Sequence, residues 1–106
     1  MYLINTTFQT DNDISADFVD FVSNEMIPVA VHECGMADPV FTRIRPHAGS
    51  DTTEKTTGYA LQLRAPSESA FESYCSDCLP AFLEALFGRW GQRVVHFTSV
   101  LDIIKR

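Results

Sequence analysis

The chain has 106 residues, of which 45% are hydrophobic, a proportion typical of a folded globular domain. Its 14 acidic residues against 8 basic ones give a net charge of −6, which disfavours nucleic-acid binding because such binding depends on neutralising phosphates. No apolar run is long enough to span a membrane, and the N-terminus lacks a basic region, so we expect no signal peptide. We therefore expect a cytoplasmic protein with one domain over residues 1–106.

The first half of the chain predicts a strand followed by a helix. Met1–Thr10 alternates between two faces with a period of two, as a strand does. An amphipathic helix follows, with Ser15 or Asp13 as its N-cap, and it runs to about Glu33. Pro28 falls inside this pattern and predicts a kink or break, because proline removes a backbone donor.

Two further strands are predicted next, at Val40–Arg45 and Gly58–Ala65. The second, GYALQLRA, alternates strictly between an apolar face and one that carries Gln62 and Arg64, which indicates one buried face. The stretch Pro46–Thr57 between them is rich in Gly, Ser, Thr and charge, and it predicts a long hairpin connection.

The last part of the chain predicts a second helix and a fourth strand. Ser69-x-x-Glu72 has capping-box spacing, with Ser67 as the alternative cap. The helix runs to about Trp90, with an interruption at Pro80. Val94–Leu101 is the final strand.

This order of elements, βαββαβ, is that of the ferredoxin-like α+β fold. Right-handed crossovers place both helices on one face of a four-stranded antiparallel sheet, in the order fourth, first, third, second strand. The other face, which we call the open face, is left without helices. Combining the alternations of the four strands assigns it Leu3, Asn5, Thr7, Phe41, Arg43, Arg45, Ala60, Gln62, Arg64, Val94, His96 and Thr98.

The predicted open face mixes amide, guanidinium, imidazole and apolar groups. Such a mixture suits a pocket that orients a small polar or anionic molecule. The candidate ligand-binding residues are Asn5, Arg43, Gln62, Arg64 and His96. The catalytic candidate is His96, as a general base. The alternative is a sheet face that only meets solvent or a second copy of the chain.

Three cysteines are present, and their odd number in a chain with no export signal argues against a disulfide framework. Cys75 and Cys78 lie inside the second helix on its apolar face, so we interpret them as buried structural residues. A zinc site would need Cys34 and His32 close by. No phosphate loop, nucleophile elbow or paired-carboxylate site is present, so we expect no cofactor and no metal.

The whole chain resembles a family of small bacterial domains of unknown function. The resemblance rests on Tyr2–Thr7, Met26-Ile27-Pro28, Gly58–Leu63, Tyr74, Leu79-Pro80, and Arg89-Trp90-Gly91 leading to Val95–Ser99. The family is similar to the dimeric α/β-barrel group, in which two ferredoxin-like units pack sheet to sheet. That group includes cofactor-free monooxygenases, haem-degrading enzymes and stress-response domains, so the resemblance implies a homodimer but no single activity.

The chain departs from the pattern of its relatives at two places. Relatives tend to have His at Met26, and Phe-Arg-Thr at Phe97-Thr98-Ser99. The haem-degrading members place an axial histidine on the second helix, where this chain has none. The leading hypothesis is thus a homodimer that binds a small molecule on its open face. The alternatives are a non-enzymatic interaction dimer with an acidic helical surface that meets a basic partner, and a monooxygenase-like enzyme without a cofactor.

Overall fold

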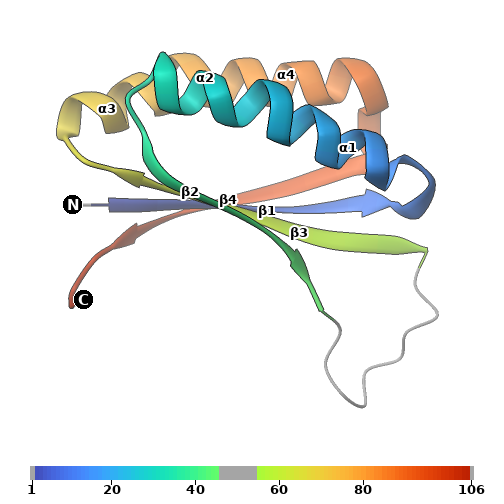
Figure 1. The fold of residues 1–106 in the computed structure, drawn as a ribbon. Helices are drawn as coiled ribbons and strands as arrows, with labels where there is room; N and C mark the ends of the chain where they lie inside the picture. The colour runs from blue at the N-terminus through green and yellow to red at the C-terminus, as the bar shows by residue number, and fades with distance from the viewer. Residues whose placement is uncertain (1, 46–54, 106) are drawn as a thin grey trace.

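The computed structural model describes residues 2–45 and 55–105 as a four-stranded antiparallel sheet with helices on one face (Figure 1). The strands run in the spatial order β2-β3-β1-β4, which confirms the predicted ferredoxin-like fold and strand order. Most of the predicted hairpin connection, residues 46–54, lies outside the described residues. The strands are β1 (Tyr2–Asp11), β2 (Ala37–Ile44), β3 (Thr56–Ala65) and β4 (Val94–Asp102).

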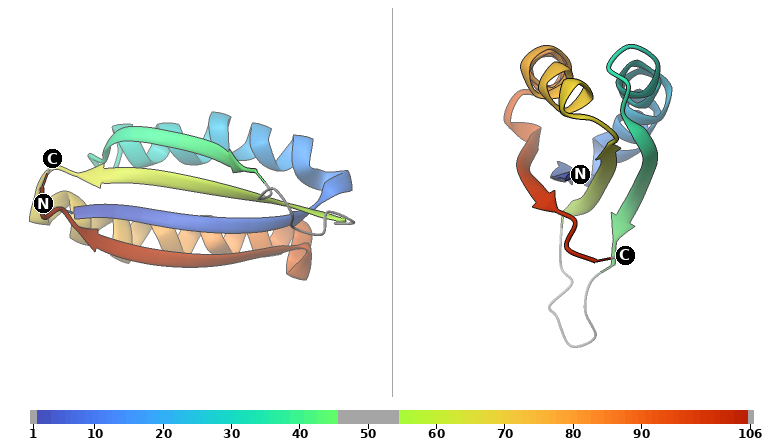
Figure 2. Two further views of the ribbon diagram at one scale, coloured as in Figure 1. Left: turned by 90° about the horizontal axis from the view of Figure 1, so that it is seen from below. Right: turned by 90° about the vertical axis from the view of Figure 1, so that its left-hand side faces the viewer.

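Two helical arms, each with the same internal irregularity, cover the sheet. The first arm joins α1 (Ser15–Phe21) to α2 (Ile27–His32) through the π-helical turn Val22–Met26. The second arm joins α3 (Glu68–Ser73) to α4 (Leu79–Trp90) through the π-helical turn Tyr74–Cys78. Figure 2 shows the two arms side by side on the same side of the sheet.

Each π-helical turn ends two residues before a proline, Pro28 or Pro80. Proline has no amide hydrogen, so the hydrogen bond to the carbonyl four residues earlier cannot form. A π-helical turn widens the helix at that point and changes which carbonyls lack a donor. The interruptions predicted at the two prolines therefore take the form of π-helical turns inside helices that continue.

The helix starts differ from the predicted ones. Ser67 caps the second arm, because its hydroxyl accepts a hydrogen bond from the amide of Ala70 at 3.1 Å. Ser69, the first choice in the sequence analysis, lies within α3 instead. At the first arm neither Ser15 nor Asp13 caps through its side chain. The Ser15 hydroxyl instead donates to the backbone carbonyl of Asp11.

The hydrophobic core lies between the arms and the sheet, and aromatic rings dominate it. Phe18 of α1 is fully buried at its centre. Its ring contacts those of Phe8 at 5.1 Å, Tyr59 at 5.4 Å and Trp90 at 6.2 Å between centroids. These spacings are in the range in which aromatic pairs attract one another. The core thus joins both arms to the central strands.

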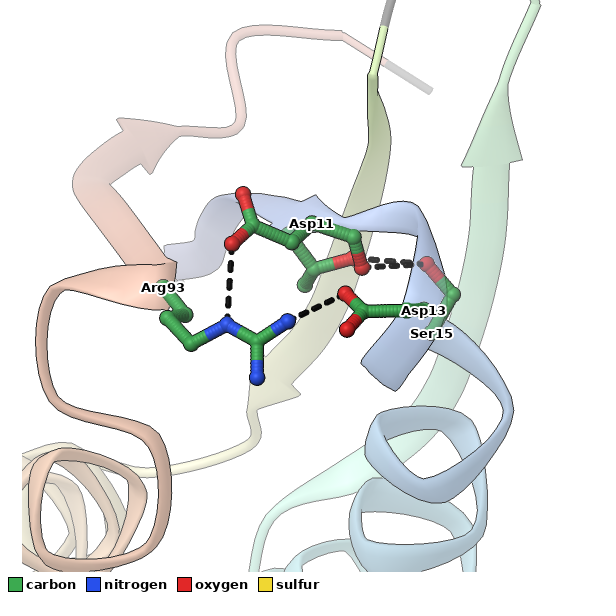
Figure 3. A network of polar contacts seen from close by, with 5 residues as sticks. Asp11, Asp13, Ser15 and Arg93 are labelled. Atoms are coloured by element: carbon green, nitrogen blue, oxygen red, sulfur yellow. Dashed lines mark hydrogen bonds and ion pairs between the residues drawn. The ribbon is translucent and has the colours of Figure 1, made fainter.

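A pair of aspartates and one arginine hold the start of β4 against the end of β1 (Figure 3). The Arg93 guanidinium donates to the carboxylate of Asp11 at 2.9 Å and also to that of Asp13. These two carboxylates raise the pKa of Arg93. The Asp13 side chain is largely exposed and those of Arg93 and Asp11 are partly exposed, so the cluster serves to position the strand ends more than to stabilise the fold.

The expectation of no disulfide is wrong, whereas Cys78 is buried as predicted. A disulfide joins Cys34, just after α2, to Cys78 in the second π-helical turn, with 6.9 Å between the Cα atoms. The two cysteines are 44 residues apart in the sequence, so no local pattern predicts that they pair. Cys75 is free, and burial raises the pKa of its thiol. Among the described residues no group of three or more metal-ligating side chains occurs.

Candidate functional site

The two central strands present the polar residues predicted for the open face. Asn5 of β1 pairs with Gln62 of β3 in the sheet register. The residues that flank this pair along the strands, Ile4 and Leu63 on one side and Thr6 and Leu61 on the other, are buried under the helices. Because side chains alternate along a strand, Asn5, Gln62 and Arg64 point away from the helices.

The two edge strands have the opposite phase from the predicted one. Arg43 of β2 pairs with the buried Tyr59, and His96 of β4 pairs with the buried Phe8. Both side chains therefore lie on the helix-covered side of the sheet, and their predicted place on the open face is wrong. Asn5 pairs with Ser99 of β4, not with His96, and Gln62 pairs with Val40, not with Arg43.

Apolar side chains occupy the open-face positions of the edge strands instead. Val40 and Ile44 of β2 pair with open-face residues of β3, and Val95, Phe97 and Leu101 of β4 pair with open-face residues of β1. All five are exposed, and Phe97 is the most exposed, at 70%. Because β2 and β4 are the two edge strands, these residues flank the polar middle of the open face on both sides. Figure 1 shows β2 and β4 each bending away from the helices toward one end.

The polar middle of the open face consists of half-buried side chains on β1 and β3. The Asn5 amide donates to the Thr7 hydroxyl at 3.3 Å. Arg64 donates to the carboxylate of Asp38 at 2.6 Å, where a β-bulge interrupts the pairing of β2 with β3. Among the described residues, none forms a hydrogen bond with the Gln62 side chain, which leaves its amide free to bind another molecule.

The chemistry that this face can perform is limited by its residues. Among the described open-face positions in the sheet register, none is a histidine, cysteine or lysine. The amides of Asn5 and Gln62 can donate and accept hydrogen bonds but do not exchange protons near neutral pH. These amides can bind and orient a molecule, whereas His96, the predicted general base, lies on the other side of the sheet.

Arg43 belongs to a different feature, a groove on the helix-covered side. This groove measures about 440 Å³ and lies between α1 and β2. Arg43 lines it together with Asp20, Val19, Phe41 and Tyr59. The groove was not predicted because the expected phase of β2 put Phe41 and Arg43 on the open face. The apolar rim was not predicted because the expected phases of both β2 and β4 were reversed.

The chain belongs to the family described as a domain of unknown function (DUF4286), whose sequence profile matches residues 1–104. This membership agrees with the resemblance found in the sequence. No curated protein matches the chain significantly. Within the described residues, no helix is both long enough and apolar enough to cross a membrane.

Solved structures with the same fold cover nearly the whole chain. One is a dimeric ferredoxin-like protein from an uncultured marine organism, 18% identical, with a TM-score of 0.66 over 99% of this chain and 96% of the other. A monooxygenase of Streptomyces coelicolor in complex with nanaomycin D is 14% identical, with a TM-score of 0.67 over 99% and 88% of the two chains. A cofactor-independent oxygenase from Streptomyces nogalater is 12% identical, with a TM-score of 0.65 over 99% and 95%. At such identities the likeness establishes the fold alone.

Proposed function

We propose that the chain forms a homodimer through the open face of its sheet and binds a small polar molecule between the two sheets. The observation that carries this proposal is the distribution of side chains on that face. Apolar residues lie on the edge strands, and polar residues lie on the central strands. When two such faces pack together, the apolar edges bury each other and the polar middle is enclosed.

The apolar rim supports the dimer. Val40, Ile44, Val95, Phe97 and Leu101 are all exposed in the single chain. Scattered exposed apolar residues are normal, but a group on one face commonly marks an interaction surface. A second copy of the chain fits because its rim is also apolar and a twofold axis brings each rim against the other. A protein with the same fold is described as dimeric, which adds support.

The polar middle supports a ligand. Packing two sheets together without a ligand would bury the Gln62 amide of each copy with no hydrogen-bond partner among the described residues of its own chain. An unsatisfied buried amide costs about 1–3 kcal/mol. A molecule that carries hydroxyl, carbonyl or carboxylate groups would satisfy the amides of Asn5 and Gln62. Arg64 favours a neutral or anionic ligand, although the carboxylate of Asp38 offsets part of its charge.

Two alternatives differ from this proposal in what the open face does. A purely structural dimer would leave the polar middle filled by the partner chain, with no bound molecule. A cofactor-free oxygenase is suggested by the similar structures that are described as oxygenases. Binding without catalysis is better supported than an oxygenase activity, because Arg43 and His96 lie on the helix-covered side of the sheet and not on the open face.

Native mass spectrometry of the freshly purified protein, followed by denaturation, tests the proposal. We expect a dimer that carries extra mass, which denaturation releases. Gln62→Leu should keep the dimer and lose the extra mass, since leucine has a similar volume and no amide. The matched control is Gln92→Leu, an exposed glutamine next to α4 that should keep both. A dimer without bound mass would contradict the ligand, and a monomer would contradict the whole proposal.

A further inference from the structure

The groove between α1 and β2 has the composition of a binding site of its own. It lies on the helix-covered side of the sheet, so it is separate from the open face and does not depend on the proposed dimer. Its volume of about 440 Å³ falls within the range of small-molecule sites. Residues of the three elements α1, β2 and β3 line it.

One wall of the groove is aromatic and rigid. The rings of Phe41 and Tyr59 stack with centroids 5.8 Å apart and an interplanar angle of 30°. Phe18 supports the Tyr59 ring from the core at 5.4 Å. Val19 of α1 extends the apolar lining. Such a wall is already ordered before binding, so a flat apolar group can bind against it at a low cost in conformational entropy.

Two opposite charges line the same groove without meeting each other. Asp20 on α1 and Arg43 on β2 both border it, yet no ion pair joins them. Within residues 2–45 and 55–105, neither side chain has a hydrogen bond or ion pair to any other residue. A ligand that carries one positive and one negative group could bind both, with a charge-assisted hydrogen bond from each group.

We propose that this groove binds an α-amino acid with an aromatic side chain. The carboxylate of the ligand binds the Arg43 guanidinium, and its ammonium group binds the Asp20 carboxylate. The aromatic side chain lies against Phe41 and Tyr59. This pairing explains why a carboxylate and a guanidinium line one groove next to an aromatic wall, and it assigns Arg43 a ligand-binding role on the side of the sheet opposite to the predicted one.

Isothermal titration calorimetry with three probes tests the proposal. L-phenylalanine carries both charged groups, 3-phenylpropanoate lacks the ammonium group, and 2-phenylethylamine lacks the carboxylate. We expect L-phenylalanine to bind at least tenfold more tightly than either of the other two, because each charge-assisted hydrogen bond contributes. Absence of L-phenylalanine binding at about 10 mM, a concentration at which a specific ligand of this size should bind, would overturn the proposal.

Two substitutions show which residue binds which charged group of the ligand. Arg43→Gln should weaken L-phenylalanine and 3-phenylpropanoate at least tenfold and leave 2-phenylethylamine unchanged. Asp20→Asn should weaken L-phenylalanine and 2-phenylethylamine and leave 3-phenylpropanoate unchanged. The matched controls are Arg89→Gln on α4 and Asp17→Asn on α1, which remove the same charges outside the groove and should leave all three affinities unchanged.

The outcomes separate this proposal from the proposed function. If the two groove variants and their controls affect L-phenylalanine equally, the groove is not the binding site and the inference is wrong. If Gln62→Leu weakens L-phenylalanine and the groove variants do not, the amino acid binds on the open face instead. Circular dichroism of each variant, with a wild-type spectrum expected, shows that a lost affinity reflects the site and not an unfolded chain.

Discussion

The central strands and the edge strands of the sheet use their two faces differently. On β1 and β3 the helix-covered positions are buried and mostly apolar, whereas the open positions are half-buried and mostly polar. On β2 and β4 apolar residues occur on both faces, as Phe41 and Val40 illustrate. The central strands therefore separate a core from a polar surface, and the edge strands extend apolar surface to both sides. This difference is what places a polar middle inside an apolar rim.

The largest loss of stability is expected for a substitution in the core on the helix-covered face of the sheet. Phe18→Ala should lower the free energy of unfolding by about 3–5 kcal/mol, because it removes a fully buried ring and leaves a cavity among aromatic neighbours. Chemical denaturation measures this. Phe97→Ala, measured at a concentration at which the chain is monomeric, should change the free energy of unfolding by less than about 0.5 kcal/mol. Equal losses for the two variants would contradict the separation of the faces.

The free energy of unfolding should also depend on alkaline pH, because a tyrosine is buried on the helix-covered side of the sheet. Burial of Tyr74, which is 1% exposed, raises the pKa of its hydroxyl well above the usual value of 10.0. The unfolded chain releases this proton near pH 10 while the folded chain keeps it. The free energy of unfolding should therefore fall by up to about 1.4 kcal/mol per pH unit above pH 10. Tyr74→Phe should remove this decrease of the free energy of unfolding with pH. An unchanged pH dependence in the variant would contradict the burial of Tyr74.

Two neighbouring threonines give the finest comparison of the faces. Thr6 is buried on the covered face, where its hydroxyl shares a 3.0 Å hydrogen bond with that of Thr98 on β4. Thr6→Val should lower the free energy of unfolding by about 1 kcal/mol, since the hydrogen bond is lost. Thr7 lies half-buried on the open face, where its 3.3 Å bond from the Asn5 amide can be replaced by water, so Thr7→Val should change the free energy of unfolding by less than about 0.5 kcal/mol. Thermal denaturation of both variants measures the difference, and the reverse order would mean that the faces are assigned wrongly.

The sequence predicts the fold well because its local signals agree with one another. The strict alternation of Gly58–Ala65 gives both the strand and its buried face. The βαββαβ order and the right-handed crossover rule then give the strand order. The prolines predict where the helices become irregular but not the form of the irregularity, because a π-helical turn depends on packing around the helix.

The sequence predicts the candidate site only on the central strands. Alternation separates the two faces of a strand but does not say which face meets the helices. On β3 the polar residues decide this, whereas on β4 Val94 and Val95 are equally apolar and belong to opposite faces. Arg43 and His96 were therefore misplaced together with their strands. The contact between Cys34 and Cys78 depends on how the two arms pack, which no local pattern reports.

The most direct test of the account is the oligomeric state of two phenylalanine variants, measured by sedimentation velocity over a range of concentrations. Phe97 is 70% exposed on the open face, and Phe87 is 66% exposed on α4. We predict that Phe97→Asp raises the dimer dissociation constant at least about thirtyfold, equivalent to 2 kcal/mol, whereas Phe87→Asp leaves it unchanged. A dimer that survives Phe97→Asp and dissociates with Phe87→Asp would contradict the central claim, because the helices and not the open face would then form the interface.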